Sequence, residues 1–214
     1  MGAGDAVKAG LACADHGVPA DESPLGWLRA GYPRTALAVA KGIPFAPYPF
    51  NVRATFQGPD QPSIVNVGPD LQRVTMDTII EGIIVSGTFD RPPANVFQTL
   101  SDFFFNFQSG IEAIMNVEGA PRPSIVPNYT PIRSFADVLN ARYPRGWVLT
   151  PTQSLKMSFT ARIALPEFPY TVVMTFRAKC PINDELVNMS ARQAIEELRA
   201  CGVPVPEGYL ACCK

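Results

Sequence analysis

The sequence predicts a mainly β fold: an antiparallel two-sheet β-sandwich with two or three short helices and extended terminal arms. Apolar and polar side chains alternate with a period of two over residues 155–163 and again over residues 170–177, which is the pattern of half-buried strands. The chain also contains 22 prolines and 16 glycines, and these residues favour loops and extended segments over long helices. Its 214 residues are enough to bury a sizeable core.

Residues 1–50 are expected to form an N-terminal arm or extended segment that lies on another part of the molecule. Ser23 and Pro24 are typical of the start of a short helix, which Gly31 would end, and a second turn would end at Gly42. Helices this short need packing partners, so we expect the arm to be ordered by neighbouring subunits or by contacts with parts of the chain far from it in sequence. A mobile terminus is the alternative.

The β-sandwich domain is predicted over residues 51–181, and its first strand over residues 51–56. Residues 73–89 alternate for too long to form one flat strand, so we expect a bend or bulge near Gly82. Apolar residues then recur at helical spacing over residues 95–107 and predict an inserted helix.

The second half of this domain begins with a predicted strand over residues 111–117 and a proline-rich loop over residues 119–127. Ser134 is expected to cap a short helix that turns Phe135, Val138 and Leu139 inward. A strand at Trp147 to Leu149 then leads to the two alternating runs.

The two alternating runs are predicted to form an antiparallel hairpin from Leu155 to Arg177. The connection between them, which contains Pro166 and Pro169, is too short for a parallel crossover. The odd-numbered residues of the first strand are expected to face the core, with Phe159 among them.

Residues 182–214 are predicted to form a C-terminal helix and an extended tail. Ser190 and Gln193 have the spacing of a capping box, and Gly202 is placed to end the helix. The tail that follows contains Pro204 and Pro206.

The sequence contains no pattern that points to catalysis. His16 is the only histidine and lies outside the predicted sandwich, which argues against a histidine-based triad or a multi-histidine metal site. Asp77 and Glu81 could form a carboxylate pair, but a solvated strand face is the better interpretation. No glycine-rich phosphate-binding motif occurs. We therefore expect no enzyme activity, no cofactor and no metal site.

The cysteines show neither a zinc-binding spacing nor an even count suited to a disulfide framework. We expect reduced, mostly buried thiols, while an adjacent pair near the C-terminus would be reactive if exposed. The five are Cys13, Cys180, Cys201, Cys212 and Cys213.

The composition favours a surface that a protein partner covers. Only 17% of residues are charged while 47% are hydrophobic, and about a quarter charged is usual. A formal net charge of −1 argues against a nucleic-acid partner, and no apolar run is long enough to span a membrane. The candidate interface residues are Trp27, Leu28, Phe45, Tyr48, Phe50, Phe105 and Tyr209.

One part of the sequence resembles a viral coat-type β-sandwich, over roughly Arg73 to Cys180. The resemblance rests on the run from Trp147 to Lys156, on Ser158 to Thr160 and on Val173 to Arg177, with Leu165 and Pro166 between them. The predicted succession of an arm, a sandwich with inserted helices and a tail resembles that of capsid and vertex proteins of non-tailed, jelly-roll bacteriophages.

The resemblance implies a jelly roll that assembles with copies of itself and with other virion proteins, without catalysis. It transfers no site residues. The protein would be made in the host cytoplasm and reside in the virion; otherwise it would be cytoplasmic.

Two alternatives remain. A receptor- or carbohydrate-binding module, such as a spike or adhesin, would be favoured if Trp27 or Trp147 were exposed in a groove. A connector or tail-assembly protein of a phage would form rings.

Overall fold

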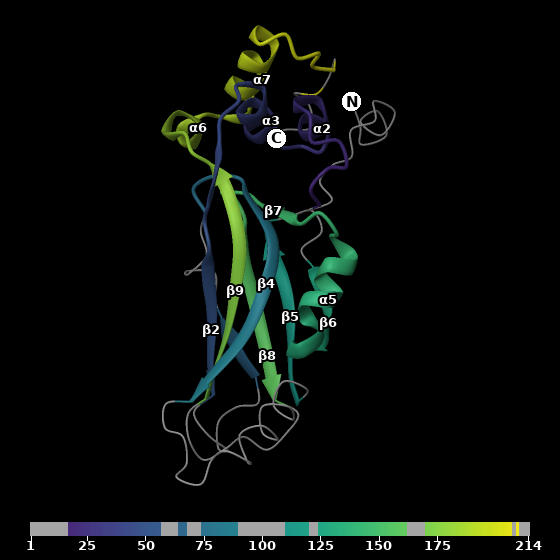
Figure 1. Cartoon of the computed structure of the whole chain (residues 1–214), viewed down its shortest axis with the longest axis vertical. Coiled ribbons are helices and arrows are strands. Elements are labelled where there is room, and N and C mark those ends of the chain that lie inside the picture. The colour runs from purple at the N-terminus through teal and green to yellow at the C-terminus, as the bar shows by residue number, and fades with distance from the viewer. Residues whose placement is uncertain are drawn as a thin grey trace.

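The computed structural model describes residues 17–56, 64–67, 74–89, 110–119, 124–161, 170–206 and 209 of the chain. Within these ranges it contains two antiparallel sheets and five short helices (Figure 1). The strands are β1 (Phe45–Pro47), β2 (Phe50–Phe56), β3 (Ile64–Val67), β4 (Thr78–Phe89), β5 (Ile111–Glu118), β6 (Ser124–Pro131), β7 (Trp147–Leu149), β8 (Ser154–Ala161) and β9 (Tyr170–Pro181). The helices are α2 (Pro24–Arg29), α3 (Pro33–Ala40), α5 (Ile132–Arg142), α6 (Asp184–Asn188) and α7 (Ala191–Ala200).

The two sheets confirm the predicted mainly β sandwich. In the first sheet the order is β1-β9-β4-β7, and β2 pairs with β9 beyond the end of β1. The second sheet has the order β3-β8-β5-β6. All pairs are antiparallel, and they nest: β2 pairs with β9, β3 with β8, β4 with β7 and β5 with β6. This is the order that results when one long hairpin of four strand pairs is rolled into two facing sheets.

The predicted hairpin of Leu155 to Arg177 is wrong, because its two strands lie in different sheets. Strand β8 pairs with β3 and β5, whereas β9 pairs with β1, β2 and β4. The alternation correctly indicated that each strand has one buried face, and the buried faces of β8 and β9 both lie in the core between the sheets. The alternation within a strand does not indicate which other strand it pairs with. The expected burial of Leu155, Met157 and Phe159 is confirmed, since each is at most 1% exposed.

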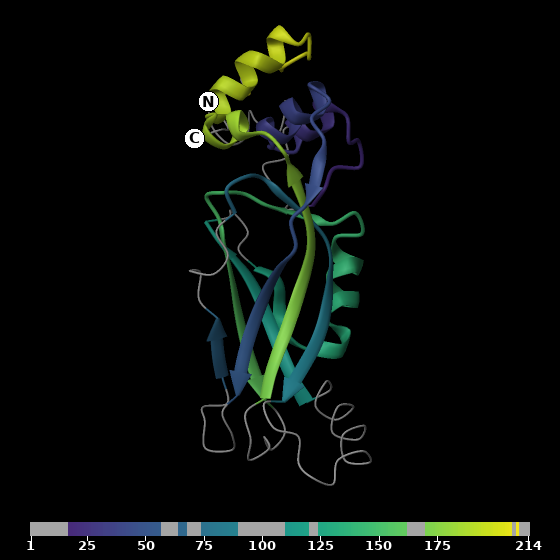
Figure 2. The same cartoon turned by 60° about the vertical axis from the view of Figure 1, so that its left-hand side comes forward.

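The main core fills the space between the sheets. Phe176 of β9 stacks on Phe50 of β2, with ring centroids 4.8 Å apart, and meets the Trp147 ring edge-on at 6.4 Å. Helix α5 packs against β4 of the first sheet and against β5 and β6 of the second (Figure 2). Its buried Phe135 and Leu139 join the same core, so α5 closes one side of the sandwich.

Helix α5 differs from its prediction at two points. It begins at Ile132 with Pro131 as its N-cap, two residues before Ser134. Val138 was expected inward but is 40% exposed. The preceding loop is also shorter than expected, because β6 already begins at Ser124.

The expected irregularity of the long strand is confirmed as a register shift between Ile80 and Gly82 of β4. Ile80 pairs with Ala178 and Gly82 pairs with Arg177, so Glu81 is the extra residue. One extra residue exchanges the two faces of a strand. For this reason Ile80 is fully buried whereas Ile84, an even number of residues later, is 53% exposed.

A second core lies at one end of the sandwich, where α2, α3, α6 and α7 form a helical cap (Figures 1 and 2). It contains Trp27 and Leu37 from the N-terminal helices and Ile195 from α7. Ile79 of β4 and Val148 of β7 also belong to it, while their neighbours Ile80 and Trp147 face the main core. Alternate residues at this end of the first sheet thus serve two cores.

The two terminal segments pack on each other at this end of the sandwich. Pro24–Arg29 and Pro33–Ala40 are helical near the predicted turns, and they pack on α6 and α7 of the same chain. The predicted capping box of Ser190 and Gln193 is confirmed at the start of α7. The predicted helix over residues 95–107 lies outside the described residues.

Candidate interaction surface

The first sheet has an outward face that the helical cap covers only at one end. Beyond the cap, none of the described helices lies over β2, β9 and β4 (Figures 1 and 2). Cross-strand neighbours form rows there, such as Arg53–Val173–Ser86 and the row of Thr175 with Ile84. We call this surface the outer face; it consists of Asn51, Arg53, Thr55, Ile84, Ser86, Thr171, Val173, Thr175 and Arg177.

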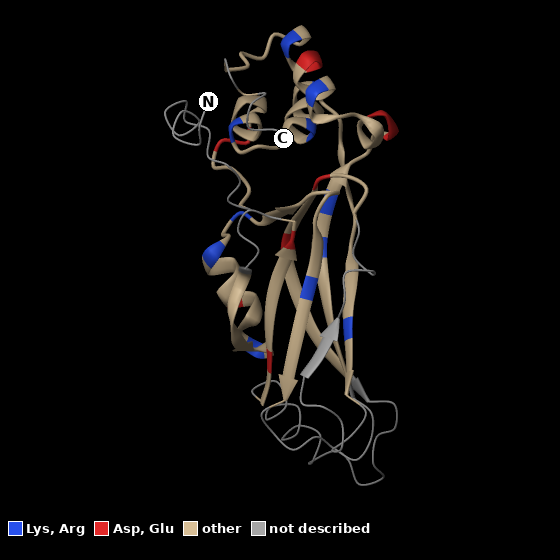
Figure 3. Ribbon diagram, turned by 180° about the vertical axis from the view of Figure 1, so that it is seen from behind, with Lys and Arg blue, Asp and Glu red and all other residues tan. Residues whose placement is uncertain are grey.

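The outer face carries an unbalanced positive charge. Figure 3 shows how few charged residues lie along the strands. Arg53 and Arg177 are the charged residues of the outer face, and neither has a carboxylate partner in the described part of the chain. Ile84 lies on the same face. An exposed branched apolar side chain close to unpaired guanidinium groups is typical of a protein interface.

Gly82 positions the Arg177 side chain. A Cβ atom at residue 82 would lie 2.7 Å from a terminal nitrogen of the Arg177 guanidinium group. The guanidinium therefore lies over the backbone at the bulge, in space that only glycine leaves open.

A notch lies at the end of the outer face next to the cap. It has a volume of about 320 Å³ and is lined by Phe45, Pro47, Pro49, Glu81, Arg177, Ala178 and Lys179. It forms because β1 and β2 pair with different parts of β9, and the chain between them detours through Tyr48, whose N–H donates to the Ala178 carbonyl at 2.7 Å. Lys179 and Glu81 form an ion pair at 2.5 Å. Arg177 is thus the cation of the notch that has no acidic partner among the described residues.

The structure brings some of the predicted interface residues together and separates others. Phe45 lines the notch, Tyr48 is 41% exposed beside it, and Phe50 follows at the start of β2. Trp27, Leu28 and Tyr209 are at most 2% exposed and belong to the core of the helical cap. Their apolar surface is covered by their own chain, so they do not form an open surface. Phe105 lies outside the described residues.

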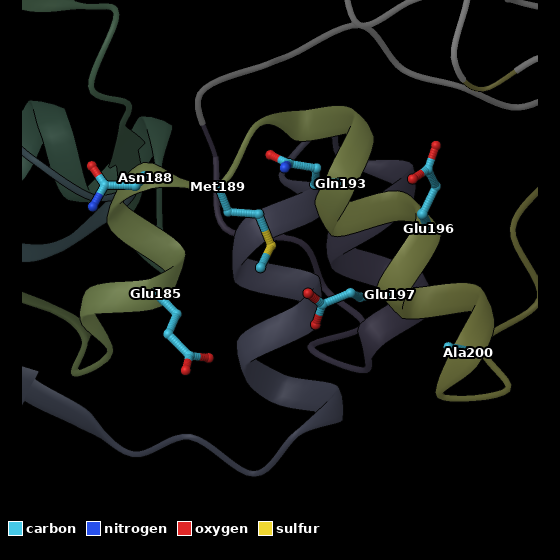
Figure 4. Close-up of a pocket in the computed structure, with 7 residues that line it drawn as sticks. All are labelled: Glu185, Asn188, Met189, Gln193, Glu196, Glu197 and Ala200. Atoms are coloured by element: carbon cyan, nitrogen blue, oxygen red, sulfur yellow. The ribbon is translucent and has the colours of Figure 1, made fainter.

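A second hollow, of about 470 Å³, lies on the helical cap and is acidic. Glu185 of α6 and Glu197 of α7 point into the space between these helices (Figure 4). We call it the acidic groove; its lining residues are Glu185, Asn188, Met189, Gln193, Glu196, Glu197 and Ala200.

Two of the three carboxylates in the acidic groove have partners within the chain. Glu197 pairs with Lys41, the C-cap residue of α3, and this hydrogen bond raises the pKa of the lysine. Glu196 pairs with Arg192 one turn earlier on α7. Glu185 forms no ion pair with a described residue, and its charge acts on Lys41 from a greater distance than that of Glu197.

The carboxylates of Asp77 and Glu81 do not form a pair of equivalent groups, because Asp77 is buried and Glu81 is exposed. Asp77 accepts a hydrogen bond from the Thr35 hydroxyl at 3.0 Å. Thr35 is the third residue of α3, a helix whose N-cap residue, Tyr32, makes no side-chain capping hydrogen bond. The Thr35 backbone N–H also donates to this carboxylate, so Asp77 caps the first turn of α3 from the β body.

Burial raises the pKa of the Asp77 carboxyl above its ordinary value of 3.8, and the Thr35 hydrogen bonds and the positive charge of Arg34 oppose this rise. The native state therefore binds this proton more tightly than the unfolded state does. The resulting stability is complete below pH 3.8 and is lost as pH rises through the raised native pKa.

We expect Asp77→Asn to remove this pH dependence, because the amide oxygen still accepts from Thr35 but does not ionise. Urea unfolding over a pH series measures it. The stability of the variant relative to that of the wild type should rise with pH across the window. Asp184→Asn, at an exposed carboxylate, should leave the wild-type profile unchanged. Identical profiles for Asp77→Asn and the wild type would contradict the assignment.

Of the cysteines and the histidine, the structure describes Cys180 and Cys201. Cys180 is half-buried, which raises the pKa of its thiol, and Cys201 is exposed. Cys13, Cys212, Cys213 and His16 lie outside the described ranges. Among the described residues, no three His, Cys, Asp or Glu side chains are grouped so as to hold a metal ion. None of the helices described has the length and hydropathy of a membrane span.

Comparison of the chain with protein-family models, with curated proteins and with solved structures finds no match.

Proposed function

We propose that the protein is a structural subunit of a virion, a coat or vertex protein that assembles with copies of itself and with other virion proteins and does not catalyse a reaction. The observation that carries this proposal is the nested strand order, β2-β9-β4-β7 facing β3-β8-β5-β6. We infer from it an eight-stranded jelly roll, an architecture found in viral capsid proteins and also in lectins and cupins.

The surface supports a structural role among these possibilities. The outer face combines Ile84, exposed at 53%, with few charges and with two arginines that have no acidic partner among the described residues. Such a surface gains free energy when another protein covers it. Fold alone does not select a function, so the outer face is what favours assembly.

A receptor- or carbohydrate-binding module is the second candidate, and the notch beside Tyr48 is the feature that favours it. The tryptophans that would have strengthened it, Trp27 and Trp147, are only 2% and 1% exposed. A ring-forming connector remains the third candidate, and particle symmetry distinguishes it from a shell protein.

The test is the oligomeric state of the purified protein, measured by sedimentation velocity and negative-stain imaging over a concentration series. We expect closed shells or shell fragments that form as concentration rises. Rings alone would favour the connector. A strict monomer at high concentration would refute the structural role, and glycan-array binding by that monomer would establish the second candidate.

A further inference from the structure

The outer face and the acidic groove are complementary in charge and in apolar content. On the outer face, Arg53 and Arg177 accompany the apolar Ile84 and Val173. In the acidic groove, the carboxylate of Glu185 accompanies the apolar side chains of Met189 and Ala200. Among the described residues, the outer face thus has an excess of positive charge and the acidic groove an excess of negative charge, each next to apolar atoms that contact would remove from water.

The two surfaces also differ in position, which decides what kind of assembly they would form. The acidic groove lies on the helical cap between α6 and α7, and the outer face lies along the strands of the first sheet. When one patch on a molecule binds a different patch on the next copy, the contact is heterologous. Repetition of a heterologous contact gives a ring if the rotation closes, and an open array if it does not.

We propose that a second copy of this chain docks its α6–α7 end on the outer face, with its Glu185 carboxylate at the Arg177 guanidinium. The guanidinium is exposed at the notch and is held over Gly82. A planar guanidinium binds a carboxylate through two parallel hydrogen bonds. Ile84 and Met189 supply the apolar part of the contact. This inference rests on the proposed function, since it names the surfaces through which the subunit would assemble.

Charge reversal tests the pair. We expect Arg177→Glu and Glu185→Arg each to weaken self-association by about tenfold or more, because each places like charges opposite one another. The double variant, with both changes, should recover most of the association. Raising the salt from about 0.15 M to about 1 M shortens the screening length from about 8 Å to about 3 Å, so it should weaken the wild type more than either single variant.

Arg29→Glu is the matched control, because it makes the same charge change at an exposed residue of α2 outside both surfaces. It should associate like the wild type. Circular dichroism checks that each variant is folded. If a reversal unfolds the chain, the neutral variants Arg177→Gln and Glu185→Gln replace it, and each should weaken association by a smaller factor.

The outcomes separate this inference from the proposed function. If the wild type assembles and neither reversal changes the association, the proposed pairing is refuted while the structural role stands. If the wild type stays monomeric at every concentration, the proposed function fails, and this inference fails with it. Weakening in both single variants without recovery in the double variant would refute the contact between Arg177 and Glu185.

Discussion

Phe159→Asp is expected to prevent folding. The Phe159 ring is fully buried between the two sheets, so the substitution removes a large apolar side chain and places a carboxylate in the main core. Loss of the ring and burial of the charge together cost at least about 5 kcal/mol, which is comparable to the whole stability of an ordinary domain, about 5–15 kcal/mol. Circular dichroism and urea unfolding of the purified variant would measure this.

Ile84→Asp is the control for this substitution. It also replaces a large apolar residue with aspartate, but at a side chain that is 53% exposed on the outer face. The isolated chain should fold with nearly unchanged stability. A folded Phe159→Asp variant with the melting curve of the wild type would contradict the placement of β8.

Gly146→Ala is expected to destabilise the protein by roughly 2–5 kcal/mol. The residue has a φ of 93°, and a Cβ atom there would lie 2.4 Å from the Ile80 carbonyl oxygen of β4. The added methyl group must therefore push apart two backbone segments, β4 and the start of β7, and no side-chain rotation relieves that contact. The shift in the urea midpoint measures the effect.

Gly42→Ala separates the cost of the positive φ from the cost of the contact with the Ile80 carbonyl oxygen. Gly42 also has a positive φ, 65°, but a Cβ atom there would have no neighbour within 4 Å. It should cost only the backbone term, about 1–2 kcal/mol. Equal losses for the two variants would show that the close approach at Ile80 adds nothing.

Local signals in the sequence were sufficient to predict the structure wherever that structure depends on residues close together in the chain. The capping box of Ser190 needs only Gln193, three residues later, and it occurs as predicted. The buried faces of β8 and β9 likewise follow from the alternation within each strand. Hydrogen bonding between strands uses backbone groups that are the same for every residue, so the alternation could not reveal that these strands lie in opposite sheets.

The exposed residues of the outer face could not be predicted from the alternation for a different reason. A strict period of two places Ile84 in the same phase as Ile80, but the extra residue at Glu81 reverses the phase beyond it. The sequence suggested a bulge near Gly82 without locating the extra residue, so the exposure of Ile84 was not foreseen. The alternation over residues 170–177 directs Arg177 away from the buried face of its strand, but its position at the notch depends on Gly82 of another strand.

The helical cap was missed because its parts are distant in the sequence. Its N-terminal helices give only weak local signals, and the apolar faces of the cap helices are covered only when residues 24–40 meet residues 184–200. Trp27 and Leu28 were therefore interpreted as an open surface for neighbouring subunits. The remote cap that Asp77 provides for α3, 42 residues away from Thr35, has no sequence pattern at all.

The construction of the helical cap from both flanks of the sandwich has a kinetic consequence. Strand β2 pairs with β9, and α3 packs on α7, so these contacts join segments more than a hundred residues apart. Contacts at such separations close slowly because of the loop entropy that they cost. During synthesis, the core that contains Trp27 and Leu37 stays incomplete until α7 has emerged from the ribosome. A nascent chain that stalls before residue 191 would expose these side chains to chaperones and to aggregation.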